Sequence, residues 1–205
     1  MMNSALPRYA GLLCLLTMLV GCGSSPPSKH YVLTARPASA PSGDTPSLGI
    51  GPIRVPEYLN RNSLVYQRQG NELQVSGTER WAEPLEDGLK RVISMNLALL
   101  VNTQNVRLFP WNAQRAPDYG IKVNLLSLDA NDQEVRMVAE WLVYRPDTSE
   151  TVRRRISKFR QPLPEGELQP EQIAPAYSAL VYQLSEIIAQ TITSAEAQRA
   201  GRPED

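Results

Sequence analysis

Alternation of apolar and polar residues marks several segments of the chain as β-strands with one buried face. The clearest alternation covers 121–125 and 135–143, and the turn-forming residues 129–133 between them predict a long hairpin. A second hairpin is predicted around Gly70-Asn71, from 64–68 to 72–75. Val138, Leu142 and Tyr144 add apolar side chains on the second face of the strand at 135–143, which allows that strand to be covered on both sides. Further strands are expected at 31–34, 48–55, 106–109 and 152–159.

Two longer segments have the 3.6-residue period of amphipathic helices. The first is expected to open at Trp81-Ala82-Glu83-Pro84-Leu85, with Pro84 at the first helical position, and its apolar stripe contains Leu85, Leu89, Val92, Ile93, Leu97 and Leu100. The second begins between Pro170 and Pro175, and its stripe contains Tyr177, Leu180, Leu184, Ile187, Ile188 and Thr191. Since the first helix lies between strands, the pattern predicts a single small α/β domain, a mixed β-sheet with about two long helices packed on its faces. A purely antiparallel sheet with both helices on one side is the alternative.

The first residues have the order of a secretory signal. Arg8 precedes the apolar run 12–20, which is well short of the roughly 20 residues that span a bilayer as a helix. The run ends in Leu19-Val20-Gly21-Cys22, which resembles the bacterial lipobox. That resemblance implies that the signal peptide, 1–21, is removed and that the thiol and the new amine of Cys22 are acylated. An ordinary cleavage site beside a chance cysteine is the alternative.

Lipidation of Cys22 has a consequence for organisation and location. One acyl chain binds a membrane only reversibly, whereas several chains hold a protein there stably. Gly23 follows the cysteine in place of the aspartate that usually retains lipoproteins in the inner membrane, so the resemblance implies the outer membrane, with the protein facing the periplasm. The expected organisation after the signal is a lipidated tether, a globular domain and a polar tail, at 22–30, 31–196 and 197–205.

Composition excludes several classes of function. Lys and Arg number 21 and Asp and Glu number 21, so the chain has no basic field of the kind that binds nucleic acid. Cys14 leaves with the signal and Cys22 is acylated, so the mature domain has no cysteine for a disulfide, a nucleophile or a metal. His30 is the single histidine and lies in the tether. We therefore expect no cofactor, no metal and no catalytic residue, and the chain is predicted not to be an enzyme.

Two clusters of charge allow a second interpretation. Asp129, Asp132 and Glu134 are close in sequence and could supply the acid/base pair of a hydrolase, but carboxylates in a hairpin turn are usually only solvated, and we reject that interpretation. The run 153–155 contains three arginines, and alternation places Arg154 opposite to the other two. These arginines could contact anionic head groups or an acidic partner. Protection of an exposed sheet edge is their more ordinary role.

Several motifs in combination resemble one known family. The lipobox is followed within ten residues by Tyr-Val-Leu at 31–33, then by Gly-Pro-Ile-Arg-Val-Pro-Glu-Tyr-Leu at 51–59, Trp-Ala-Glu-Pro-Leu at 81–85 and Ala-Glu-Trp at 139–141. Together they resemble the PqiC/YmbA-type ABC-transport auxiliary lipoproteins over roughly residues 22–194. The resemblance implies a small α/β fold and a non-enzymatic outer-membrane component. The implied partners are an MCE-domain (PqiB-like) protein, its inner-membrane transporter and the lipid leaflet. Only the acylated cysteine, Cys22, carries over as a functional residue.

Two hypotheses about the role remain. In the first, the protein is a docking adaptor at the outer-membrane end of a lipid-trafficking system that supports envelope integrity, with identical subunits forming an oligomer or ring. The segment 55–60 and the loop before Trp81 are then candidate contacts, although Tyr58, Leu59 and Trp81 are also typical core residues. In the second, the protein is a periplasmic lipid carrier with its own apolar cavity between helix and sheet. The aromatic content of 6% gives no excess of apolar residues for such a cavity.

Overall fold

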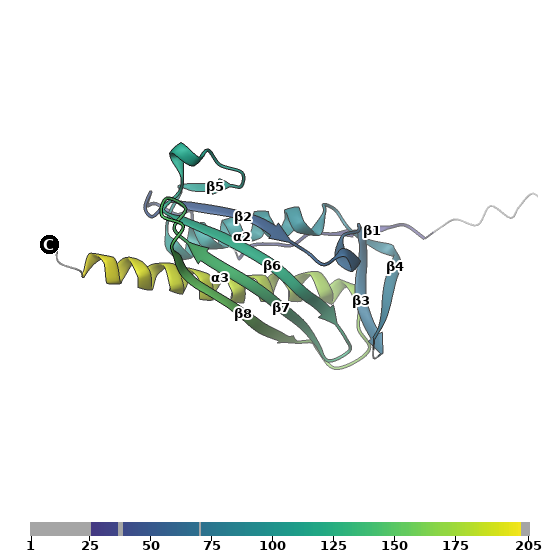
Figure 1. Cartoon of the computed structure of the whole chain (residues 1–205). Helices are drawn as coiled ribbons and strands as arrows, with labels where there is room; N and C mark the ends of the chain where they lie inside the picture. Colours follow the sequence, from purple (N-terminus) through teal and green to yellow (C-terminus); the bar gives the residue numbers. More distant parts are fainter. Residues whose placement is uncertain (1–25, 37–38, 70, 202–205) are drawn as a thin grey trace, which may run out of the picture.

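A five-stranded mixed sheet forms the centre of the computed structural model, which describes residues 26–36, 39–69 and 71–201. Its strand order is β5-β2-β6-β7-β8 (Figure 1). The strands are β2 (Leu48–Arg54), β5 (Val106–Leu108), β6 (Tyr119–Ala130), β7 (Glu134–Tyr144) and β8 (Thr151–Pro162). β2 runs parallel to β5 and β6, whereas the β6–β7 and β7–β8 pairs are antiparallel. The predicted mixed sheet and long hairpin are therefore confirmed. The signal peptide 1–21 and Cys22 lie outside the described residues.

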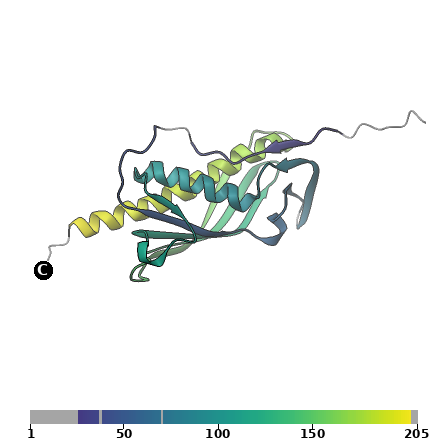
Figure 2. The same cartoon turned by 90° about the horizontal axis from the view of Figure 1, so that it is seen from above.

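Both long helices, α2 (Leu85–Val101) and α3 (Pro170–Ala200), pack on the same face of this sheet (Figure 2). The helices therefore do not lie on both faces; the alternative was right to place them on one side, but its purely antiparallel sheet is wrong, because β2 pairs in parallel with β5 and β6. The reason for the one-sided cover lies in β7, where alternate residues are fully buried beneath the helices while Glu134, Arg136 and Glu140 point to the other side. That second side is only half-buried, so β7 is covered on one face.

The ends of the helices differ slightly from the sequence prediction. Trp81 ends a strand instead of opening a helix, and Pro84 is the N-cap of α2, one position before the first helical residue. α3 begins at Pro170, where the side chain and backbone of Gln169 form a reciprocal cap with Gln172. The helix continues to Ala200, and its residues 197–200 are exposed, which fits their polar composition.

A separate three-stranded sheet has the order β1-β4-β3. It consists of β1 (Lys29–Tyr31), β3 (Ser63–Gln69) and β4 (Glu72–Trp81), with the predicted hairpin between β3 and β4. The predicted strand at 31–34 lies two residues earlier in the structure. Leu33 is buried in the core, the Leu33 carbonyl accepts from Arg91 Nη2, and the Thr34 N–H donates to Ser178 Oγ, so helices replace a strand as its partners.

The core fills the space between the helices and the five-stranded sheet, and it extends to the small sheet through a stacked pair. The rings of Trp81 and Tyr177 lie 6.3 Å apart between centroids. Burial raises the pKa of Tyr177 well above its usual value, so this phenol stays neutral in the core. Two short 3₁₀ turns, η2 (Glu57–Leu59) and η3 (Ala113–Arg115), lie in the connections after β2 and β5.

Ser47 and Asp118 fix the register of the parallel strands β2 and β6. Asp118 Oδ2 accepts from both the N–H and the Oγ of Ser47, each at 2.7 Å, and the Asp118 N–H donates to Ser47 Oγ at 2.9 Å. These bonds precede the Leu48–Tyr119 pair of the ladder. Burial opposes ionisation of Asp118, but the two bonds from Ser47 and the charges of Arg199 and Arg145 together outweigh it and lower the pKa of this carboxyl.

Candidate functional site

Three large side chains that were candidates for partner contact are core residues. Leu59 and Trp81 are buried. The Tyr58 hydroxyl donates to Asp129 Oδ1 at 3.3 Å and accepts from the Leu128 N–H at 3.2 Å, and burial raises its pKa. Tyr58 therefore holds η2 against β6, Leu59 packs in the core and Trp81 stacks on Tyr177, so none of the three presents a free contact surface.

The three carboxylates in and beside the hairpin turn each have a different structural partner. Asp129 accepts from Tyr58, Asp132 accepts from the Leu168 N–H at 3.1 Å, and Glu134 lies 3.7 Å from Arg136 Nε. The structure thus uses them to hold neighbouring segments and does not arrange them as an acid/base pair. Within the described residues, no group of three or more His, Cys, Asp or Glu could hold a metal ion.

The structure separates the arginine run on β8, which is an edge strand as predicted from its charge. Arg154 lies opposite Leu142 on the side away from the helices, and its Nε is 3.9 Å from Glu140 Oε1. Arg153 and Arg155 point to the helix side, where they line a groove beside α3. The predicted division of the three arginines is confirmed.

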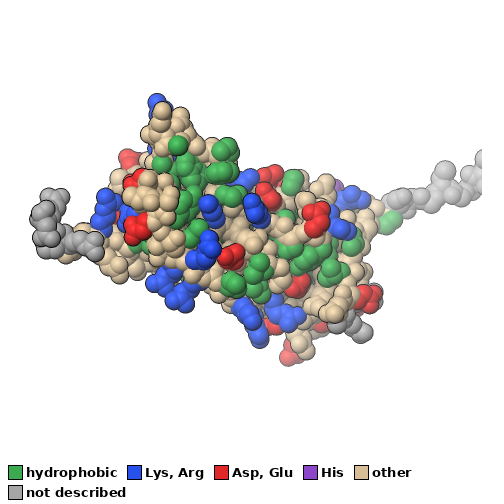
Figure 3. Space-filling view, viewed as in Figure 1, with side chains coloured by type: hydrophobic (Ala, Val, Ile, Leu, Met, Phe, Trp, Pro, Cys, Tyr) green, Lys and Arg blue, Asp and Glu red, His purple; other side chains and the backbone are tan. Residues whose placement is uncertain are grey.

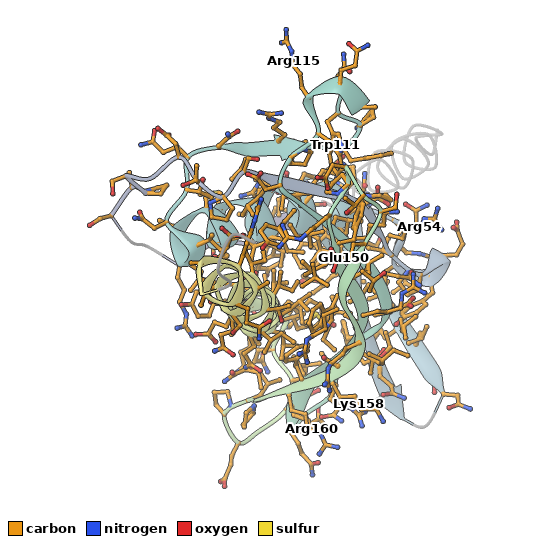
Figure 4. The ribbon with its side chains drawn as sticks, turned by 60° about the vertical axis from the view of Figure 1, so that its left-hand side comes forward. Arg54, Trp111, Arg115, Glu150, Lys158 and Arg160 are labelled. Carbon is orange, nitrogen blue, oxygen red and sulfur yellow. The ribbon has the colours of Figure 1, made fainter. Side chains whose placement is uncertain are left out.

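The side of the five-stranded sheet that faces away from α2 and α3 is the largest uncovered feature of the fold. We call it the open face. Figure 3 views the molecule from this side and shows basic side chains gathered over β6, β7 and β8 around fewer acidic ones. By strand register, its seven basic residues are Arg54, Arg107, Lys122, Arg136, Arg154, Lys158 and Arg160, and its three acidic residues are Asp129, Glu134 and Glu140. Figure 4 labels Arg54, Lys158 and Arg160, which the register places on the side opposite α3.

The open face is apolar as well as basic. Ile156 is 63% exposed and Leu126 is 42% exposed, and Val138 and Leu142 lie half-buried between them and the basic residues. Isolated exposed apolar residues are normal on a protein surface, but here they share one face of one sheet. Such a mixture of apolar and charged side chains is suited to binding a partner.

A hollow of about 280 Å³ lies near the middle of the open face. Arg54, Lys122 and Arg154 surround it, together with the single carboxylate of Glu140. Glu140 pairs with Arg154, which leaves Arg54 and Lys122 without an acidic residue to balance them in the lining, so the hollow keeps a net positive charge. It is suited to an anionic side chain from a partner.

Aromatic rings fix one end of the open face over two glycines. The Tyr144 ring lies on Gly120, so close that a Cβ at Gly120 would be 2.4 Å from Tyr144 Cε1. Lys122 Nζ lies 4.7 Å from the centre of the same ring, and burial raises the pKa of Tyr144. Trp111 covers Gly49 in the same way, below the η3 turn that carries Arg115 (Figure 4). This end of the face is therefore rigid.

The sequence analysis did not select Arg54, Lys122 and Ile156 as functional residues. The signal that could have found Lys122 was the polar half of the alternation in β6, and the signal for Ile156 was an apolar residue among the charged positions of β8. Both signals were incomplete because alternation shows that two faces differ and does not show which face the helices leave open.

Similarity to known proteins covers most of the chain. Residues 31–189 match the family of the ABC-type transport auxiliary lipoprotein component. Over 84 residues the chain is 30% identical to intermembrane transport lipoprotein PqiC from Escherichia coli strain K12, and equally so to PqiC from Shigella flexneri. These matches cover 39% of this chain and 45% of each relative, so the chain spans less than half the length of these curated relatives.

Solved structures share the fold at low sequence identity. Protein XCC0632 from Xanthomonas campestris superposes with a TM-score of 0.67 at 14% identity, covering 84% of this chain and 99% of that one. A crystal structure of an uncharacterized protein gives a TM-score of 0.63 at 18% identity, covering 82% and 99%. In the described part of the chain neither helix is long and apolar enough to cross a membrane. The chain belongs to the family of ABC-type transport auxiliary lipoprotein components, and it is similar to PqiC.

Proposed function

We propose that this lipoprotein is a non-enzymatic docking component at the outer-membrane end of an MCE/ABC-type lipid-trafficking system. Its partner is an MCE-domain (PqiB-like) protein that connects to an inner-membrane transporter. Family membership supports a role in transport, and the curated relative is named an intermembrane transport lipoprotein. One observation carries the docking role: both helices cover one face of the central sheet, and the open face presents its basic and apolar residues outward except at the end where Tyr58 and Gln67 contact Asp129 and Arg136.

The proposed anchor is acylated Cys22, whose acyl chains insert into the periplasmic leaflet of the outer membrane. The six residues 23–28 between it and β1 reach at most about 20 Å. β1 is held to the body by its ladder with β4 and by an ion pair between Lys29 Nζ and Glu171. The small sheet therefore lies next to the membrane, and the opposite end of the molecule, where α3 ends, points toward the periplasm (Figure 1).

A lipid carrier is the second candidate, and one groove favours it. This groove has a volume of about 830 Å³ and lies between α2, β5 and the segment around Pro41. It contains Met95 and Leu108, both about half exposed. The groove is on the outer side of α2, whereas the helix–sheet interface expected for a carrier cavity is occupied by buried side chains.

Site-specific cross-linking in cells tests the two candidates. A photoreactive residue replaces Ile156 on the open face or Met95 in the α2 groove, and partners and lipids are identified by mass spectrometry after mild detergent extraction. We expect the MCE-domain protein to be captured from position 156 and not from position 95, and capture to fall when Cys22→Ala removes the anchor. Stoichiometric lipid from position 95, without any transporter component, would replace the docking role with the carrier role.

Charge reversal on the open face gives an independent prediction. Arg154→Glu removes one of the three cations around the hollow and repels an acidic partner, so recovery of the MCE-domain protein should fall severalfold. Stability should change by less than about 1 kcal/mol, because the pair with Glu140 is exposed. Unchanged recovery with a stable variant would show that this face is not the contact.

A further inference from the structure

A groove of about 480 Å³ separates the edge strand β8 from the C-terminal half of α3. It lies on the helix side of the sheet, away from the open face, and toward the end of the molecule opposite β1 (Figure 1). A neighbouring hollow shares Val152, Ala195 and Gln198 with it. That hollow is mixed in charge, because Asp118, Asp147 and Glu150 line it together with Arg145 and Arg199.

Two arginines give the groove a positive charge, and no acidic residue among the described residues that line it balances that charge. Arg153 and Arg155 are two residues apart on β8, so their backbones lie about 7 Å apart on the same side of the strand. Neither guanidinium has an ion pair or a hydrogen bond with another described residue, and the lining contains no Asp or Glu. Arg154 between them has Glu140 on the opposite face.

Neutral donors complete the polar side of the groove. The Trp141 Nε1–H donates to Ser157 Oγ at 3.0 Å, so the proton of the Ser157 hydroxyl remains available to a ligand. Ser194 and Gln190 add a hydroxyl and an amide from α3. A site with two guanidinium groups and several neutral donors is complementary to a tetrahedral oxyanion, since guanidinium forms bidentate bonds with phosphate.

The floor of the groove is apolar. Trp141, Val152, Ile187 and Ala195 line it beneath the arginines. An inorganic ion has no apolar surface to bury against this floor. A phospholipid does, because its phosphate is attached to a glycerol and to the first methylenes of the acyl chains. An extended acidic peptide would use the charge but leaves the concave floor unfilled.

The wall formed by α3 is held in place before any ligand binds. The Tyr119 hydroxyl donates to Glu196 Oε1 at 2.6 Å and accepts from Arg145 Nη2 at 3.1 Å. Burial and the bond to Glu196 raise the pKa of Tyr119 to about 12, so the phenol remains a donor at neutral pH. A groove with fixed walls loses less conformational freedom on binding.

From this geometry we infer that the β8–α3 groove binds the phosphate group of an anionic phospholipid, with Arg153 and Arg155 contacting the phosphate. That the phosphate belongs to a lipid rests on the proposed function, whereas the anion site stands on the geometry alone. The groove lies at the periplasmic end of the proposed orientation. There it would hold a headgroup that arrives from the partner.

Native mass spectrometry of the full-length lipoprotein in a nonionic detergent tests the inference, because it counts the lipid molecules retained by each protein. Phosphatidylglycerol, phosphatidylcholine and glycerol phosphate are added separately at equal mole ratio. We expect retention of phosphatidylglycerol to exceed that of phosphatidylcholine and of glycerol phosphate by at least about fivefold. Arg153→Gln/Arg155→Gln should remove that preference.

Arg61→Gln/Arg115→Gln is the matched control, since it also removes two arginine charges, from exposed positions outside the groove. It should retain phosphatidylglycerol as the wild type does, and circular dichroism should show all variants folded. Equal loss in the control would show non-specific attraction and overturn the site. Equal retention of glycerol phosphate would overturn the lipid assignment, and displacement of phosphatidylglycerol by a poly-glutamate peptide at equal concentration would assign the groove to an acidic protein segment. Failure of the proposed function is seen separately, as loss of cross-linking from position 156 with headgroup retention intact.

Discussion

The two faces of the central sheet are made by alternate residues of the same strands, yet they differ in almost every property. On β7, Met137 and Val143 are fully buried under the helices, whereas their neighbours Val138 and Leu142 are only half-buried on the open face. On β6 and β7 the residues buried under the helices are all uncharged. The open face holds seven basic residues, three acidic ones and exposed apolar side chains.

The difference shows how one sheet can serve stability and binding at once. Burial of apolar surface under α2 and α3 stabilises the fold, so the opposite face is free to carry residues that contribute little to folding. The arginines follow the same division, because Arg154 belongs to the open face while Arg153 and Arg155 belong to the groove beside α3. Substitutions at adjacent positions should therefore have unlike effects.

The largest difference is expected between Met137→Ala and Val138→Ala. Met137 is fully buried, and its truncation leaves a cavity that should cost about 2–5 kcal/mol. Val138 is half-buried on the open face, so Val138→Ala should lower the free energy of unfolding by only about 1 kcal/mol, mostly through lost strand propensity. Urea unfolding followed by circular dichroism measures both. Equal losses would mean that the open face is packed as tightly as the covered one.

A smaller effect is expected where an aromatic ring occupies the open face. In Gly120→Ala the new Cβ would lie 2.4 Å from Tyr144 Cε1, so the ring must move, at about 1–3 kcal/mol. Removing the ring as well, in Gly120→Ala/Tyr144→Ala, should make the glycine substitution nearly neutral. Gly77→Ala on β4 is the control, since its Cβ would meet no atom within 4 Å. Additive losses in the double variant would contradict the close contact.

The smallest effect concerns the register of the sheet and depends on pH. The pKa of Asp118 is lowered in the folded state, so its carboxylate stabilises the fold above about pH 4 and loses that effect as pH falls through the lowered pKa. Asp118→Asn should lose about 1 kcal/mol at pH 7 and approach the wild type in acid. Unfolding midpoints between pH 7 and pH 2 check this.

The matched control for that measurement is Asp44→Asn. Asp44 is exposed and has no hydrogen-bond or ion-pair partner among the described residues, so its substitution should leave the profile unchanged. A wild-type profile for Asp118→Asn would show that the bonds to Ser47 contribute nothing to stability.

The sequence predicted most helices and strands of the fold, but it did not predict all of the segments that pack against them. The alternation at 121–125 and 135–143 and the helical stripe from Leu85 were sufficient because strand and helix periods are local. The strand predicted at 31–34 failed because Leu33 and Thr34 contact residues of α2 and α3 that are distant in sequence. The sequence also did not decide whether Tyr58 and Trp81 contact a partner or pack in the core, because their neighbours are likewise distant in sequence.

The sequence alone determined the likeness to a transport lipoprotein family, the hairpins, the helices and the opposite directions of Arg154 and its neighbours, and it alone carries the Leu-Val-Gly-Cys motif from which acylation of Cys22 is predicted. These features depend on residues that are adjacent or one period apart. Only the tertiary structure decided that both helices share one face, that the other face is open, and that Arg153 and Arg155 line a groove. These depend on packing between segments distant in sequence, which periodicity within one segment does not specify.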